Sequence, residues 1–211
     1  MLRYIYGENL PKHMKLHDTM FRDRAAQFRE RLDWDVNVDE QGYERDEYDA
    51  MNPLYVIWEL ADGSHGGSMR FLPTVGQTMV NDHFHHLSDG VEIRHPLIWE
   101  CTRFCLSQNA PSRVSAALML GGMEVGLGNY LTDSVGVFDA RMTRIYRRLG
   151  WSPTVLGTDG NGRDAISVGL WNYDRKIRPI LLRRAGLSDE LSRLWYDRAF
   201  GSVQSPLAMV G

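Results

Sequence analysis

The stretch IWECTRFCL, residues 98–106, is the strand signal on which the assignment of the fold rests. It is apolar except for Glu100, Thr102 and Arg103, which indicates a β-strand buried on both faces. A buried charge is costly unless it is paired or used, so Glu100 and Arg103 are candidates for a structural salt bridge or for function. Strict alternation points these two side chains to opposite faces. A shared site therefore requires a β-bulge between them, a feature common beside active sites.

Strands and helices succeed one another on both sides of this stretch. Short apolar runs bounded by turn residues predict strands, and apolar residues at steps of three and four predict helices. The expected strands lie at residues 2–6, 53–60, 67–72, 134–138, 153–157 and 165–171, and the expected helices at residues 21–32, 109–131 and 140–149, with two more at the end of the chain. This order predicts a single domain over residues 1–211, a three-layer α-β-α sandwich with a mixed sheet.

Two segments depart from these regular patterns. Residues 35–49 are acidic and poor in apolar side chains, so we expect a loop there. The expected helix at residues 109–131 contains four glycines, which indicate close packing against the sheet: Gly121, Gly122, Gly126 and Gly128.

Length and composition are those of an ordinary globular protein. The 211 residues are 43% hydrophobic and 24% charged, with neither a signal peptide nor a run long enough to span a membrane, so a cytoplasmic location is expected. The only cysteines, Cys101 and Cys105, favour core packing over catalysis, because no histidine falls on the neighbouring strand positions. The three histidines of NDHFHH, residues 81–86, lack a carboxylate or cysteine at ligand spacing, so no metal site is expected.

Charge is unevenly distributed along the chain. Residues 1–60 contain thirteen acidic and eight basic side chains, whereas residues 141–184 contain three acidic and ten basic ones. An acidic region suits a cationic small molecule, and a basic region suits an acidic protein or a polyphosphate. The alternative is that both are solvated faces without a partner.

A second group of candidates surrounds the end of the first helix. Arg24, Phe28 and Trp34 combine a cation with two aromatic rings, and the acidic loop adds Asp46 and Asp49, so together they could form a pocket for a flat cationic ligand. Phe28 also belongs to the apolar stripe of its helix, which favours core packing. Arg70 is a lone cation in a predicted strand, where an edge-strand charge is the simpler interpretation.

These motifs together resemble those of a known family. Arg24, Phe28 and Trp34, then DEYD at residues 46–49, SMR at 68–70 and WECTRF at 99–104, closely resemble the acyl-homoserine lactone synthases of the LuxI type, which make the autoinducers of bacterial quorum sensing. The resemblance implies a fold related to GCN5-type acyltransferases. It places nine residues at the family's characteristic positions: Arg24, Phe28, Trp34, Asp46, Asp49, Arg70, Phe84, Glu100 and Arg103.

The resemblance also implies a reaction and a role for each residue. The α-amine of S-adenosylmethionine attacks an acyl thioester, and the carboxylate of the same molecule then displaces methylthioadenosine to close the lactone. S-adenosylmethionine is thus a substrate, and no cofactor is expected. Glu100 would accept the amine proton, and Arg103 would act beside it as the second catalytic residue. The remaining seven would bind substrate: Arg24, Phe28, Trp34, Asp46, Asp49, Arg70 and Phe84.

The acyl donor is expected to be an acyl carrier protein or acyl-CoA, with no nucleic-acid or membrane partner. The acyl chain would enter an apolar slot beside the helix that carries Met119, Leu120, Met123 and Val125. On the helix at residues 140–149, Met142, Ile145, Tyr146 and Leu149 form the predicted inward stripe. The predicted docking face for an acidic carrier lies opposite and comprises Arg141, Arg144 and Arg148, extended by Lys176.

Two other functions remain open at this point. One is a different N-acyltransferase with a GCN5-like fold, although the chain has Ser107–Ser112 (SQNAPS) where such enzymes carry a glycine-rich pyrophosphate loop. The other is a non-catalytic protein that binds an acyl or adenosyl ligand. The presence of Arg24, Glu100 and Arg103 argues against this second alternative.

Overall fold

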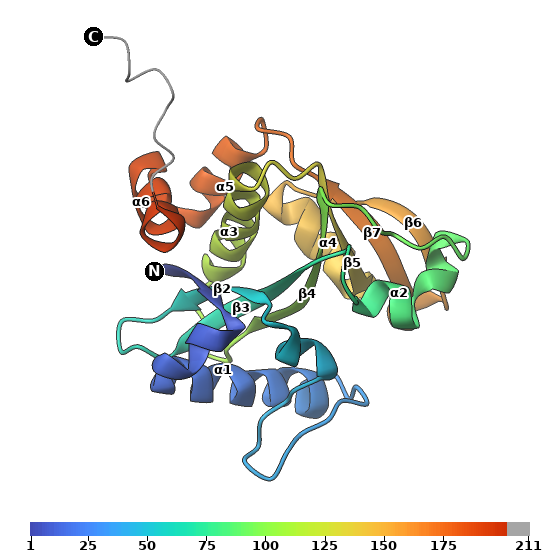
Figure 1. Cartoon of the computed structure of the whole chain (residues 1–211), viewed down its shortest axis with the longest axis horizontal. Coiled ribbons are helices and arrows are strands. Elements are labelled where there is room, and N and C mark those ends of the chain that lie inside the picture. Colours follow the sequence, from blue (N-terminus) through green and yellow to red (C-terminus); the bar gives the residue numbers. More distant parts are fainter. Residues whose placement is uncertain (202–211) are drawn as a thin grey trace.

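A single seven-stranded sheet organises the protein (Figure 1). The computed structural model describes residues 1–201. The strands follow the order β1-β2-β3-β4-β5-β7-β6, and within the described residues only β4 and β5 pair in parallel. Their bounds are Leu2–Tyr6 (β1), Leu54–Glu59 (β2), His65–Pro73 (β3), Ile98–Leu106 (β4), Asp133–Asp139 (β5), Thr154–Asp159 (β6) and Ile166–Asn172 (β7).

Helices cover both faces of this sheet, which confirms the predicted three-layer α-β-α sandwich. Helix α1, Met14–Ala25, lies on one face, and α3 and α4 lie on the other (Figure 1). The C-terminal helices α5 and α6 pack against α3. The bounds of these helices are Val114–Gly128 (α3), Ala140–Leu149 (α4), Arg178–Ala185 (α5) and Asp189–Phe200 (α6). No helix within residues 1–201 combines the length and the hydropathy of a membrane-spanning segment.

Side chains on the two faces of β2 enter two different cores. Leu54, Val56 and Trp58 belong to the large core beneath α3, whereas Tyr55 and Ile57 belong to a smaller core beneath α1. Successive strand residues point to opposite faces, so a strand that is apolar throughout is buried on both. The sheet is therefore packed on both faces at β2.

A β-bulge interrupts β4 at Arg103, as the sequence predicted. Ser68 of β3 pairs with Cys105 and Arg70 pairs with Thr102, so β4 carries one extra residue between these pairs. Arg103 absorbs the irregularity with a φ of 54°, a left-handed conformation that is unusual for a residue other than glycine. The bulge turns Arg103 to the face that already carries Glu100 and Thr102.

The parallel pair β4 and β5 separates soon after it forms. Residues 98–100 of β4 pair with residues 133–135 of β5, and the two strands form no further pair with each other. The bulge begins two residues beyond the last pair, and the two strands enclose a widening gap from that point. This gap is where the cavities described below meet.

Some elements differ from the sequence-based expectations. Residues 35–49 contain the start of a 3₁₀-helix, Glu47–Met51, and an unpredicted short helix, α2, spans Met79–His83. The helix expected from residue 109 begins at Val114 and ends at Gly128. Ile145 was expected on the inward stripe of α4, but it is 38% exposed. The buried residues of that helix are Tyr146 and Leu149.

Glycines in α3 allow side chains to approach the helix closely. A Cβ built on Gly126 would lie 2.0 Å from the ring of Tyr173, whereas one on Gly122 would lie 3.1 Å from the flexible end of Met69. Gly121 and Gly122 face the sheet as expected. Gly126 instead faces Tyr173, which follows β7, and Gly128 faces Tyr196 of α6.

This difference predicts that two glycines on neighbouring turns of α3 tolerate substitution by alanine to different degrees. We expect Gly126→Ala to lower the free energy of unfolding by at least about 1–3 kcal/mol, because Tyr173 must leave its place. Gly122→Ala should change it by less than about 1 kcal/mol, since the gain in helix propensity offsets a small shift of Met69. Urea unfolding of both variants measures the difference, and equal stability of the two would contradict it.

Candidate active site

Two buried arginines, one half-buried arginine and three carboxylates form one ion network on the α1 side of the sheet. Arg24 comes from α1, Arg70 from β3 and Arg103 from β4, whereas all three carboxylates come from residues 44–49. Arg24 Nε lies 2.5 Å from Glu44 Oε2, and Arg24 Nη2 lies 2.8 Å from Asp49 Oδ2. The other pairs are Arg70 with Asp46 and Asp49, and Arg103 with Glu44 and Asp46 at 2.9 and 2.7 Å.

Burial makes this network strongly interdependent. Arg24 and Arg70 are almost completely inaccessible to solvent. Burial alone would lower the pKa of Arg24, but Asp49 and Glu44 raise it above its ordinary value. Burial would raise the pKa of Asp49, but the charges of Arg24 and Arg70 hold it well below its usual range. Arg24 and Asp49 are therefore both charged at neutral pH.

Local hydrogen bonds give the carboxylate segment its shape. Glu44 forms an isolated β-bridge with Val38, and the Asp46 side chain caps the 3₁₀-helix that follows, accepting hydrogen bonds from the backbone N–H of Tyr48 and of Asp49. In return, Asp49 accepts a hydrogen bond from the Asp46 N–H at 3.0 Å. This reciprocal capping box explains how an acidic, apolar-poor segment folds locally.

Glu100 lies beside the network but has no arginine partner within hydrogen-bond distance. Its carboxylate is 1% exposed and accepts hydrogen bonds from the backbone N–H groups of Met79, at 3.1 Å, and Val80, at 2.6 Å. Burial raises the pKa of Glu100 to about 7, although the two N–H groups oppose the shift. A carboxylate with such a pKa can take up and release a proton near neutral pH.

An open cleft of about 670 Å³ lies next to these groups. Trp34, Phe84 and Phe138 provide its aromatic surface, and Trp34 is stacked on Phe28 with ring centroids 5.3 Å apart. Acidic side chains outnumber basic ones along the cleft: Asp35, Asp46, Glu47 and Asp139 face Arg45 and Arg103. The cleft therefore suits a flat molecule that carries positive charge.

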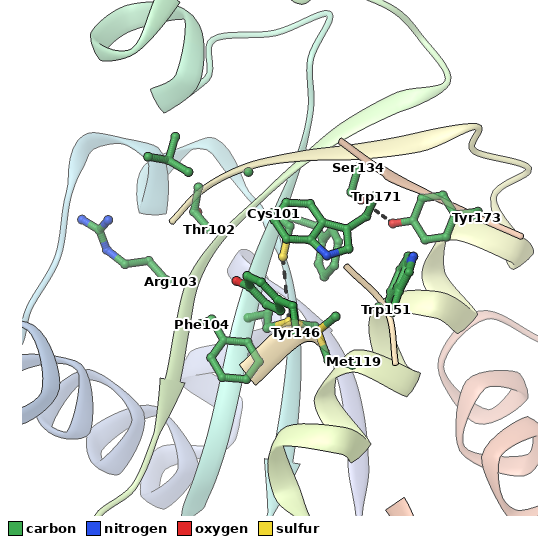
Figure 2. A pocket seen from close by; sticks show the side chains of 15 residues that line it. Cys101, Thr102, Arg103, Phe104, Met119, Ser134, Tyr146, Trp151, Trp171 and Tyr173 are labelled. Carbon is green, nitrogen blue, oxygen red and sulfur yellow. Dashed lines mark hydrogen bonds between the residues drawn. The ribbon is translucent and has the colours of Figure 1, made fainter. Parts of the chain in front are cut away.

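A smaller apolar cavity of about 60 Å³ lies on the α3 side of the gap between β4 and β5 (Figure 2). It touches the open cleft at Arg103 and Val137, the two residues that line both spaces. Most of its wall is aromatic or contains sulfur: Met69, Phe71, Cys101, Phe104, Met119, Tyr146, Trp151, Trp171 and Tyr173.

The structure brings the predicted site residues together but divides them into two sets. Trp34, Asp46, Phe84 and Arg103 line the open cleft. The other predicted substrate-binding residues, Arg24, Phe28, Asp49 and Arg70, do not line the cleft, because ion pairs and stacking hold them behind its wall. Their part in substrate binding stays a prediction. Of the helix residues expected along the acyl slot, Met119 lines the cavity, whereas Leu120, Met123 and Val125 are buried in the core.

Sequence reasoning missed several contributors. Glu44 is completely buried and joins Arg24 to Arg103. Its spacing of two from Asp46 was an available signal, because alternate residues of an extended segment share a face. Nothing in the local pattern identified Met79 as a hydrogen-bond donor to Glu100, since their contact depends on how α2 folds back onto β4.

The fold first defines a general class. The chain has the fold of a GCN5-like acyltransferase, and an acyl-CoA N-acyltransferase from Pseudomonas aeruginosa superposes on it with a TM-score of 0.54 at 14% identity, over 82% of this chain and 99% of that one. The match shows the class of the fold. It does not distinguish one acyltransferase from another.

Sequence comparison then identifies the family. The chain belongs to the autoinducer synthase family, whose profile matches residues 8–176. An acyl-homoserine-lactone synthase of Rhizobium etli is 41% identical over 179 residues, which are 82% of this chain and 84% of that one. The CoA-dependent acyl-homoserine lactone synthase BjaI, solved with SAM and isopentyl-CoA, has a TM-score of 0.79 at 22% identity and covers 90% of both chains. The chain is thus an acyltransferase of this class, and the resemblance seen in its motifs is confirmed.

The ion network predicts a large loss of stability when one charge is removed. Asp49→Asn leaves Arg24 and Arg70 short of a partner, so we expect unfolding free energy to fall by about 3–5 kcal/mol. The exposed Glu92, which pairs with the exposed Arg94, provides a matched control, and Glu92→Gln should leave the urea midpoint unchanged.

The same residue predicts a pH dependence. Because folding lowers the pKa of Asp49 from 3.8, its contribution to stability is complete above pH 3.8 and is lost as the pH falls further. The acid limb of the stability curve should therefore be shallower in Asp49→Asn than in the unmodified protein. Identical limbs would show that Asp49 does not carry this effect.

Proposed function

We propose that the protein makes N-acyl-homoserine lactones from S-adenosylmethionine and an acyl thioester. The observation that carries this proposal is the meeting of an acidic, aromatic cleft with an apolar cavity at Arg103 and Val137. A cationic nucleoside fits the first space and an alkyl chain fits the second. Their reacting ends would then lie together between β4 and β5, which holds the two substrates in position for reaction.

The reaction requires two bond exchanges and no protein nucleophile. In the first, the α-amine forms a bond to the thioester carbonyl carbon, the amine loses a proton, and the carbon–sulfur bond breaks to release the thiol. In the second, the α-carboxylate of the same molecule attacks the side-chain carbon next to the sulfonium. Methylthioadenosine leaves with the bonding electrons, and the lactone ring closes.

Glu100 is the proton acceptor in this scheme. It does not line the cleft, but it binds the backbone of Met79, which does, so the amine proton reaches it through an intervening water. A pKa of about 7 keeps a large fraction of Glu100 ionised near neutral pH and still able to hold the proton. Backbone N–H groups at the Arg103 bulge, where the register of β3 is interrupted, stabilise the oxyanion.

The open cleft holds S-adenosylmethionine. Trp34 and Phe84 offer aromatic surfaces to the adenine, and Asp46 offers negative charge to the sulfonium. Behind this wall, Phe28 supports Trp34, while Arg24, Asp49 and Arg70 fix Asp46 and Arg103 through the ion network. These four are positioning residues.

An acyl carrier protein is the proposed acyl donor, and the reaction is placed in the cytoplasm, where such carriers are loaded with acyl groups. Arg141, Arg144 and Arg148 line a surface groove of about 540 Å³ together with Arg163, and the exposed Ile145 lies among them. A basic face around an apolar residue complements an acidic carrier. Lys176 is exposed but does not line this groove, so its part in docking is less direct.

The proposed activity is tested by incubating the purified protein with S-adenosylmethionine and an acyl carrier substrate. Lactone and methylthioadenosine should appear in equal amounts by mass spectrometry. Glu100→Gln should lower kcat by roughly 10²-fold or more, because general base catalysis contributes about 10² to 10⁴. The rate of the unmodified enzyme should rise as the pH increases through about 7, since the base must be deprotonated, and this rise should be absent in Glu100→Gln.

The exposed variant Glu92→Gln serves as the control and should behave as the unmodified enzyme. If Glu100→Gln kept full activity and the same pH profile, Glu100 would not be the base. An acylated amine without lactone or methylthioadenosine would instead identify a different N-acyltransferase. Binding of S-adenosylmethionine with no product from either donor would favour a non-catalytic binding protein.

The basic groove makes a separate prediction about the donor. The double variant Arg144→Glu, Arg148→Glu should raise the KM for acyl carrier protein by roughly 10-fold or more at low salt, and leave the KM for S-adenosylmethionine unchanged. A matched double reversal on α6, Arg193→Glu with Arg198→Glu, should change neither constant. An unchanged carrier KM, together with full activity on acyl-CoA, would assign the donor role to CoA.

A further inference from the structure

The apolar cavity has a mouth and a closed end. Arg103 and Val137, which also line the open cleft, form its mouth. Trp151 and Tyr173 lie on the side away from Arg103 (Figure 2). On β5 the wall runs from Val137 to Ser134, three residues that rise about 10 Å. Ser134 lies where β4 and β5 are still paired, so the cavity narrows toward the point at which the two strands join.

Hydrogen bonds and stacking fix the closed end. The Trp151 indole N–H donates to the backbone carbonyl of Asn172 at 3.0 Å, and the hydroxyls of Tyr173 and Ser134 are hydrogen-bonded to each other. The rings of Trp151 and Tyr173 lie 5.4 Å apart. Tyr173 is also backed directly by Gly126 of α3. Neither ring can swing aside without losing a buried hydrogen bond, which makes this end rigid.

The side walls are similarly constrained. Trp171 packs edge-on against Tyr146, with ring centroids 4.9 Å apart, and both rings pack against Phe138. Gly122 of α3 completes the wall where any side chain would take up space. Met69 and Met119 are the flexible members of the lining, so adjustment to a longer chain depends on them.

The volume of this space limits what it can hold. An engineered cavity of about 150 Å³ takes one benzene molecule, which has six carbons. The cavity here is about 60 Å³ and by the same scale takes two or three carbons. If an acyl chain occupies the cavity, its carbonyl carbon and the one or two carbons next to it would lie outside this volume, at the mouth between Arg103 and Val137.

We propose that the enzyme selects short acyl groups, of about four to six carbons, and that Trp151 and Tyr173 set this limit. This inference rests on the proposed function, because it takes the cavity as the place of the acyl chain. Each methylene beyond the limit must displace a hydrogen-bonded aromatic ring. One methylene too many in an apolar pocket costs roughly 10- to 200-fold in kcat/KM, so selectivity should fall steeply above the limit.

Two variants should shift the chain length in opposite directions. Trp151→Leu removes part of the closed end, and it should raise the yield of ten- and twelve-carbon lactones relative to six-carbon lactone by roughly 10-fold or more. Gly122→Ala adds a methyl group to the wall near Met69 and Phe71, and it should lower the ratio of six-carbon to four-carbon lactone by a similar factor. Trp58→Leu is the matched control: it removes an aromatic ring of the same core that does not line the cavity, so product ratios should be unchanged.

The experiment is a competition assay. Purified protein receives S-adenosylmethionine and an equimolar mixture of saturated acyl donors of about four to twelve carbons, once as acyl carrier protein and once as acyl-CoA, and products are quantified by mass spectrometry. Ratios are compared rather than rates, so partial loss of stability does not obscure the result. Should Trp151→Leu fail to fold, Gly122→Ala carries the test alone.

The outcomes separate this inference from the proposed function. Unmodified enzyme that makes mainly lactones of eight or more carbons would overturn it, as would unchanged product ratios in Gly122→Ala. The same ratios in Trp58→Leu as in Trp151→Leu would also overturn it, because the effect would then not come from the closed end. If no lactone formed from any donor, the proposed function itself would fail.

Discussion

The buried ion network is the interaction on which the site depends. Residues 35–49 contain too few apolar side chains to bind the sheet through hydrophobic contact, and three arginines from three different elements hold them there instead. Tyr48, from the same segment, donates a hydrogen bond to Asp82 of α2 at 2.8 Å. One segment thus connects α1, β3, β4 and α2. Buried charges are expensive unless fully paired, and this requirement allows the segment one position only.

The β-bulge in β4 and the separation of β4 from β5 lie at the same level of the sheet, and together they allow the two spaces to meet. Without the extra residue at Arg103, strict alternation would point its guanidinium toward α3, away from Glu44 and Asp46. The separation of the strands then opens a passage through the sheet at the same level. A polar space on one face and an apolar space on the other can therefore meet at a single residue pair, Arg103 and Val137.

Periodicity predicted most of the scaffold, because strands such as β2 carry their burial pattern in their own sequence. In β4 the expected burial on both faces was wrong: most of its apolar side chains are half-buried, whereas Glu100 and Thr102 are buried. The bulge was also predictable, since two charges in one buried strand needed a common face. Contacts between distant segments were not: α2 has only five residues, and its bond to Glu100 joins positions about twenty residues apart. Ile145 was misplaced for a related reason. Its helix covers the sheet with a narrower stripe than its apolar residues suggested.

The hydrogen bonds of Glu100 link its protonation to the attachment of α2. Ionised, this side chain grips the first turn of α2, because charge-assisted hydrogen bonds are roughly twice as strong as neutral ones. Protonated, it loosens that grip, and Met79 and Phe84, which form part of the cleft wall, lose an anchor. The α2 part of the cleft wall is thus held most firmly when Glu100 is ionised.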